Sequence, residues 1–107
     1  MYPPETADTD ITQCAPHPRR VLVVDHDPTF GALLSAAFAC RGHHGQSTDR
    51  MADALRLLVR DMYDPVIIDL HLSDGSGLDL LENAIRAGLV TPGASVILAS
   101  HDFVEKR

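Results

Sequence analysis

The chain has 107 residues, which is enough for one folded domain but not for two. Its net charge of -6 argues against direct binding to nucleic acid or to acidic membranes, because their phosphates attract Lys and Arg. It carries only two cysteines and no run of about 18 apolar residues, so we expect a cytoplasmic protein without a disulfide framework or a membrane span.

The first elements follow from composition and from helix signals. Residues 1–19 are rich in Pro, Thr and Asp and predict a disordered leader before a domain over residues 20–107. An ordered extension is the alternative, with Tyr2 and Ile11 as its only anchors. The apolar run 21–24 predicts a buried parallel strand. Asp27 and Pro28 then predict the start of a helix, which Gly42 would close.

The later elements continue the alternation of strand and helix. Residues 43–48 predict an edge strand because another helix follows, and Asp49 is the expected cap of that helix. Apolar runs at 65–70 and 96–99 predict two more strands, and between them a polar loop leads to a helix that ends at Gly88. Such alternation predicts an α/β fold, in which helices cover both faces of a mostly parallel sheet.

Polar side chains follow three of the predicted strands. They include Asp25, Asp69 and Ser100, which would meet at the carboxyl edge of the sheet, where ligands bind in such folds. Clustered carboxylates favour a hard cation such as Mg²⁺, and a carboxylate beside it can accept a phosphoryl group covalently. Asp69 is the strongest candidate, because a carboxylate on an apolar strand is costly without a partner. Two other polar residues near these strand ends, Asp27 and Ser100, could be helix caps rather than parts of a binding site.

These residues carry a resemblance to a known family. The segments VLVVDHDPTFGALL, PVIIDLHLSDGSGLDLLENAI and SVILASHDF resemble the receiver domain of two-component response regulators. The resemblance implies a flavodoxin-like, doubly wound sheet of strand order 2-1-3-4-5 and phosphoryl transfer from a sensor histidine kinase or phosphotransfer protein to Asp69. It also implies that Asp25, Asp69 and the backbone carbonyl of His71 hold Mg²⁺, and that the hydroxyl of Ser100 contacts the phosphoryl group.

Two departures from the family pattern bear on function. His26 stands where the family has a second carboxylate, so Mg²⁺ binding should weaken, because imidazole suits zinc, copper, iron or nickel. Alternatively, His26 only fills space at the mouth of the site. The chain ends after the fourth strand, so we expect an incomplete fold without the fifth strand, its lysine and the last helix. The fourth strand would then be an exposed edge, through which a homodimer could form.

Three functions remain open at this point. The leading one is a phosphoacceptor signalling module rather than an enzyme, with Asp69 labelled in the presence of Mg²⁺. The second is a degenerate receiver that binds a partner or dimerises without phosphorylation, which His26 and the missing lysine favour. The third is a small metal-dependent hydrolase using Asp25, His26 and Asp69, for which no further acid–base group is evident.

Overall fold

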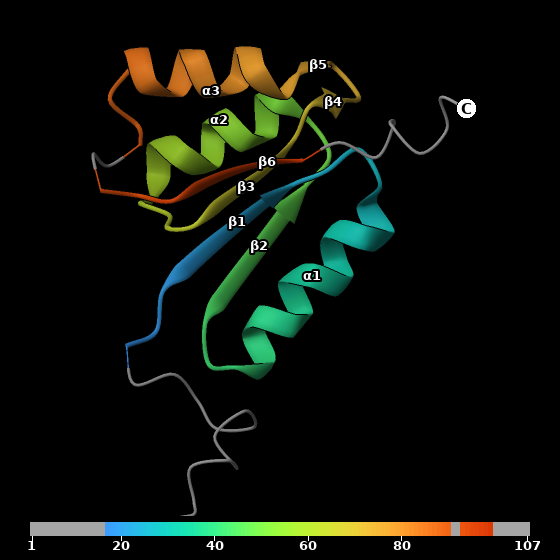
Figure 1. The fold of residues 1–107 in the computed structure, drawn as a ribbon, viewed down its shortest axis with the longest axis vertical. Coiled ribbons are helices and arrows are strands. Elements are labelled where there is room, and N and C mark those ends of the chain that lie inside the picture. Colours follow the sequence, from blue (N-terminus) through green and yellow to red (C-terminus); the bar gives the residue numbers. More distant parts are fainter. Residues whose placement is uncertain (1–16, 91–92, 100–107) are drawn as a thin grey trace, which may run out of the picture.

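The computed structural model describes residues 17–90 and 93–99 (Figure 1). The predicted leader, apart from residues 17–19, and the predicted site residue Ser100 lie outside these ranges. The main sheet has four parallel strands in the order β2-β1-β3-β6, and β4 and β5 form a small antiparallel hairpin. The elements are β1 (Arg20–Val24), α1 (Pro28–Cys40), β2 (His44–Thr48), α2 (Met51–Arg60), β3 (Val66–Asp69), β4 (His71–Leu72), β5 (Gly75–Ser76), α3 (Gly77–Arg86) and β6 (Val96–Ala99).

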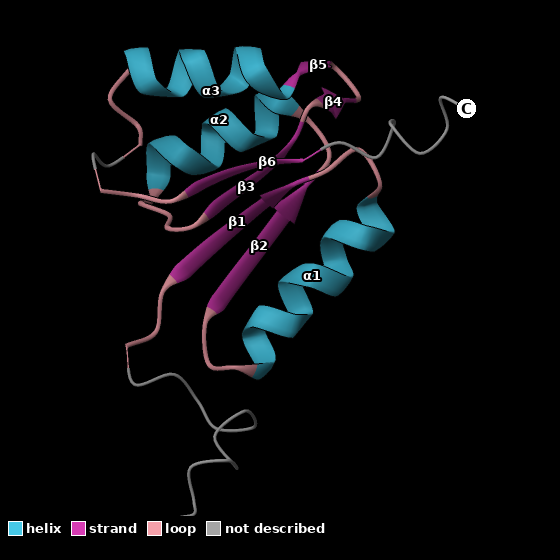
Figure 2. Ribbon diagram, viewed as in Figure 1, coloured by secondary structure: helices cyan, strands magenta, loops and turns pink. Residues whose placement is uncertain are grey.

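The sheet separates α1 from the pair α2 and α3 (Figure 2). Strand β1 lies in the middle, and all four residues from Val21 to Val24 are fully buried. Its alternate side chains, Leu22 and Val24, join the core beneath α2 and α3, together with Ala54 of α2 and Leu80 of α3. This arrangement explains why the first strand is apolar at every position, since a central parallel strand has no face in contact with water. The predicted fold class is confirmed for the described residues.

Helix α1 begins and ends where the sequence predicts. The carboxylate of Asp27 accepts hydrogen bonds from the backbone amides of Thr29 and Phe30, at 3.0 and 3.3 Å. Pro28 opens the helix with a backbone angle suited to that position. At the other end, Gly42 adopts a φ of 92°, which an L-residue with a side chain rarely does. Asp27 is therefore a helix cap, as the sequence predicts.

The predicted cap of α2 is wrong. Helix α2 starts one residue further on, after Arg50, which makes no capping hydrogen bond with its side chain. The carboxylate of Asp74, in the β4–β5 turn, accepts from the first amide of the helix instead, that of Met51, at 2.5 Å. Asp49 accepts a hydrogen bond from the hydroxyl of Ser73, in the same turn, at 3.4 Å. The start of α2 is thus tied to the hairpin that follows the candidate phosphoacceptor.

Strand β6 lies at one edge of the main sheet. Among the described strands it pairs with β3 alone, and its residues Ile97 and Leu98 are 50% and 40% exposed. Adjacent residues of a strand point to opposite faces, so both faces of the sheet carry exposed apolar surface at this edge. The prediction that the fourth strand of the main sheet is an edge is confirmed for the residues described. None of the described helices combines the length and apolar character needed to cross a bilayer.

Candidate phosphoacceptor and metal site

Two buried carboxylates lie side by side at the carboxyl edge of the sheet. Val24 at the end of β1 is in register with Ile68 of β3, so the next residues of the two strands, Asp25 and Asp69, are neighbours. Asp25 is 4% exposed and Asp69 is 1% exposed. Charged groups are rarely buried to this degree without partners, because removing them from water is costly. The pair therefore requires compensating hydrogen bonds or positive charge.

Hydrogen bonds from neighbouring loops supply part of this compensation. One carboxylate oxygen of Asp69 accepts from the backbone amide of His71 at 3.2 Å, and the other accepts from that of His26 at 3.3 Å. The Asp25 carboxylate accepts from the backbone amide of Asp27 at 2.9 Å. His71 thus holds Asp69 through its amide, whereas the predicted contact of its carbonyl with a metal remains a prediction.

The imidazole of His26 completes the partners of Asp69. Its Nδ1 atom contacts the same Asp69 oxygen (Oδ2) that accepts from the His26 amide, and it lies 3.8 Å from the Asp25 carboxylate. The His26 side chain is 44% exposed, whereas that of Asp69 is buried, so the ring lies between this carboxylate and the solvent-facing part of the site. The ring thus contacts the acidic residues directly, and the effect of His26 on metal binding stays a prediction.

The electrostatic environment shifts the pKa values of Asp69 and His26 toward their charged forms. Burial raises the pKa of Asp69, but the hydrogen bonds from His26 and His71 outweigh burial and leave its pKa below the usual value. The hydrogen bond to Asp69 raises the pKa of His26, and burial opposes it only in part. Asp69 is therefore a carboxylate at neutral pH, paired with an imidazole that favours its protonated form.

Gly77 determines how closely α3 approaches the end of β3. A Cβ atom at this position would lie 2.0 Å from the backbone oxygen of Asp69 and 2.7 Å from the side chain of Ile68. The Gly77 amide also donates to the carbonyl oxygen of Leu70, at 2.9 Å. Only glycine allows helix and strand to meet here, and the contact fixes the backbone of the candidate phosphoacceptor.

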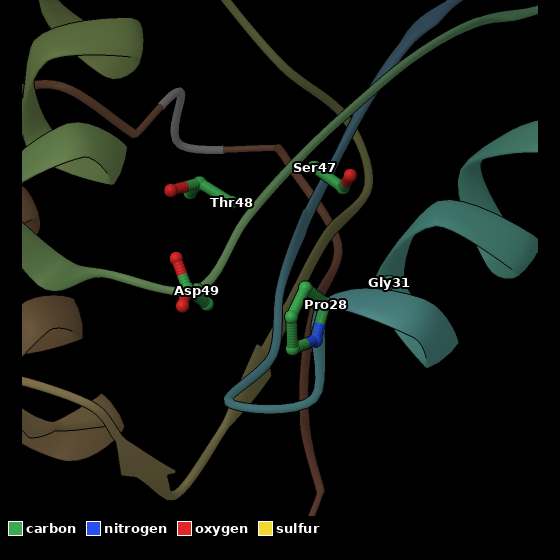
Figure 3. A pocket seen from close by; sticks show the side chains of 5 residues that line it. All are labelled: Pro28, Gly31, Ser47, Thr48 and Asp49. Atoms are coloured by element: carbon green, nitrogen blue, oxygen red, sulfur yellow. The ribbon is translucent and has the colours of Figure 1, made fainter.

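A hollow lies between the start of α1 and the end of β2 (Figure 3). It encloses about 220 Å³ and is lined by Pro28, Gly31, Ser47, Thr48 and Asp49. Sequence reasoning did not predict it, because its hydroxyl groups come from the weakest predicted strand. Among the predicted site residues, the structure brings Asp25, His26 and Asp69 together, with one ligand atom of each within 4.8 Å of the others.

Sequence comparison finds relatives among response regulators, although no family model matches the chain. The chain is 43% identical over 65 residues to the two-component response regulator ORR22 of Oryza sativa subsp. indica, which covers 59% of the chain and 9% of ORR22. It is 31% identical over 78 residues to the response regulator protein PilR of Pseudomonas aeruginosa. This match covers 73% of the chain and 18% of PilR. The chain therefore matches only a small part of these longer proteins.

Solved structures show the same architecture. The CheY-like response regulator receiver domain from Methylobacillus flagellatus superposes with a TM-score of 0.68 and 25% identity, over 78% of this chain and 70% of that one. The MaeR response regulator gives a TM-score of 0.65 and 27% identity, over 78% of this chain and 67% of the MaeR chain. The chain is a receiver-like domain. In this receiver-like domain, the central segment of the resemblance runs from β3 into α3, as the sequence predicts, but the predicted loop between them forms the β4–β5 hairpin.

Proposed function

We propose that the receiver-like domain accepts a phosphoryl group on Asp69, from a sensor histidine kinase or a phosphotransfer protein, in cytoplasmic two-component signal transduction. One observation carries the proposal: the Asp69 carboxylate is buried at the carboxyl edge of the sheet, beside the carboxylate of Asp25, and contacts the partly exposed side chain of His26. The relatives, which are response regulators, support the same function.

The proposed reaction is an in-line displacement at phosphorus. An oxygen of the Asp69 carboxylate attacks the phosphorus of a phosphohistidine, so an O–P bond forms and the N–P bond breaks. The electron pair of that bond returns to the donor's histidine nitrogen, which takes a proton from water. The lowered pKa of Asp69 keeps the attacking group deprotonated. We propose that the Ser100 hydroxyl contacts the transferred group; Ser100 lies outside the described residues.

The donor atoms fit Mg²⁺ only in part. Asp25, Asp69 and the carbonyl of His71 are the proposed ligands, and two carboxylates suit this hard cation. His26 does not suit it, because its imidazole contacts one of the Asp69 oxygens that the ion would need. We therefore expect weak Mg²⁺ binding, and no step of the reaction above depends on the ion.

We also propose that the domain forms a homodimer through the edge of β6. The backbone groups at the edge of a strand can pair with a second chain, and the exposed side chains of Ile97 and Leu98 would then gain neighbours on the added strand. Size-exclusion chromatography with light scattering tests this arrangement. A monomer at high concentration would refute it, and Ile97→Lys should dissociate a dimer.

Intact-mass analysis tests the phosphorylation. The protein is incubated with Mg²⁺ and phosphoramidate, beside Asp69→Asn and a matched control, Asp79→Asn, in the exposed first turn of α3. We expect an alkali-labile adduct of one phosphoryl group on the wild type and on Asp79→Asn, and none on Asp69→Asn. No adduct on folded wild-type protein would contradict the proposal and favour an interaction module that works without phosphorylation.

A further inference from the structure

The donor set at the carboxyl edge differs from one that favours Mg²⁺. It consists of two carboxylates, Asp25 and Asp69, and the imidazole of His26. Mg²⁺ prefers six oxygen ligands, whereas imidazole binds Zn²⁺, Cu²⁺ and Ni²⁺ well. We propose that Asp25, His26 and Asp69 form a binding site for a divalent first-row transition metal, with Zn²⁺ bound more tightly than Mg²⁺.

The positions of the three side chains are close to those that a metal would require. The ligand atoms of a tetrahedral zinc ion, at 2.0–2.2 Å from the metal, lie about 3.4 Å from one another. The Nδ1 atom of His26 is 3.8 Å from the nearer Asp25 oxygen, so a small shift of the exposed ring would bring it to this spacing. The contact between His26 and Asp69 is shorter than this and must open, so that the metal takes the place of the hydrogen between the two atoms.

The different burial of the three ligands favours this rearrangement. The two carboxylates are fixed, because both are buried at the ends of adjacent strands and accept backbone hydrogen bonds. The imidazole is the adjustable ligand, since its side chain is 44% exposed at the mouth of the site. Asp27 does not compete for this role, because its carboxylate caps α1.

The charges of the site also match a divalent ion. Two carboxylates and a neutral imidazole balance the two positive charges of the metal. Three protein ligands leave a fourth position for water or for an oxygen of an anionic ligand, as in zinc sites that keep an open position. The inference goes beyond the proposed function, because it depends on the three side chains alone and does not require Asp69 to be phosphorylated.

Isothermal titration calorimetry of the chelator-treated full chain with ZnCl₂ and MgCl₂ tests the site. His26→Ala removes the imidazole, and His26→Asp replaces it with a carboxylate. His44→Ala is the matched control, because His44 is an exposed histidine at the start of β2, and every strand of the parallel sheet begins at the edge opposite the site. Circular dichroism establishes that each variant is folded.

We expect one Zn²⁺ per wild-type chain at this site, with a Kd at least about 10-fold lower than in His26→Ala. Removing a residue that only hydrogen-bonds to a metal ligand already lowers metal affinity by about this factor, so removing a ligand should lower it at least as much. His44→Ala should bind like the wild type. His26→Asp should lower the ratio of Zn²⁺ to Mg²⁺ affinity, and Co²⁺ bound to the wild type should show visible absorption that His26→Ala lacks. Equal Zn²⁺ affinity in wild type and His26→Ala would overturn the proposal. A Zn²⁺ affinity that falls equally in His44→Ala would overturn it too.

Because no phosphodonor is present, failure here is distinguishable from failure of phosphorylation. A chain that accepts a phosphoryl group on Asp69 but shows no His26-dependent metal binding refutes only the metal site. A chain that binds Zn²⁺ through His26 but forms no adduct on Asp69 refutes only the proposed phosphorylation.

Discussion

Replacing Gly77 with alanine tests how the candidate phosphoacceptor is held in place. The new Cβ atom would lie 2.0 Å from the backbone oxygen of Asp69, whereas non-bonded heavy atoms are comfortable at about 3.5 Å. Helix α3 and strand β3 would therefore have to separate by roughly 1.5 Å at this point. The clashing atom belongs to the backbone, so it cannot be relieved by a change of side-chain rotamer.

Overpacking of this kind costs about 1–3 kcal/mol, and we expect Gly77→Ala to reach the upper part of that range. Urea unfolding followed by circular dichroism measures the loss in the free energy of unfolding. The matched control is Gly93→Ala, because a Cβ atom at Gly93 would meet none of the described residues' atoms within 4 Å. At that open position alanine should change stability by less than about 1 kcal/mol, through its effect on the unfolded chain.

The same substitution should also affect the proposed chemistry. Movement of the Asp69 backbone would displace its carboxylate from the amide of His71, which donates to it. Phosphoryl labelling of folded Gly77→Ala should therefore be slower than labelling of Gly93→Ala. If the two variants were equally stable and equally labelled, the close contact between α3 and β3 would not hold the site as argued.

Three further changes test other parts of the structure. Leu22→Ala should lower the free energy of unfolding by about 2–5 kcal/mol in urea titrations, since Leu22 is fully buried in the core; no loss would refute the packing described. Asp74→Ala should increase amide hydrogen exchange of Met51, whose amide loses its partner, while an unchanged rate would refute the cap. The contact between His26 and Asp69 predicts a pH dependence of stability. Because the pKa of His26 is higher in the folded protein than its value of about 6.5 in the unfolded chain, His26 stabilises the fold below pH about 6.5. This stabilisation is lost as the pH rises through the pKa of His26 in the folded protein. The lowered pKa of Asp69 adds stability that is lost as the pH falls through the pKa of Asp69 in the folded protein. The free energy of unfolding, measured in urea at each pH, should therefore pass through a maximum between these two pKa values. His26→Ala should flatten the decline on the alkaline side of this maximum.

The strands differ in how they could be predicted. Those with apolar runs, β1, β3 and β6, follow from the residues themselves, and the two inner strands, β1 and β3, are apolar because a strand inside a parallel sheet is covered on both faces. Strand β2, with the sequence HGQST, carries almost no such signal, and its residues are exposed or half-buried. It was predictable from topology alone, since a strand must separate two consecutive helices on opposite faces of a sheet.

The start of α2 shows why local reasoning failed there. Asp49 precedes the helix and is a residue type that commonly caps, so the sequence favours it. The observed donor–acceptor pair joins Met51 to Asp74, 23 residues further along the chain. That pairing exists because the β4–β5 hairpin folds back over the end of β2, and two-residue strands such as these leave no periodic pattern in a sequence.

His26 shows the same limit at the site itself. Its position in the sequence predicts that a nitrogen donor replaces an oxygen donor, but not that the ring reaches Asp69, 43 residues away. That contact has a consequence for both proposals, because a phosphoryl group or a metal would compete with the imidazole for the same carboxylate. His26→Ala should therefore have opposite effects: faster phosphoryl labelling of Asp69, because the oxygen is uncovered, and weaker Zn²⁺ binding, because a ligand is lost. If His26→Ala lowered both the rate of phosphoryl labelling and the Zn²⁺ affinity, His26 would support the fold of the site. If it raised both the rate and the affinity, His26 would only block access to Asp69.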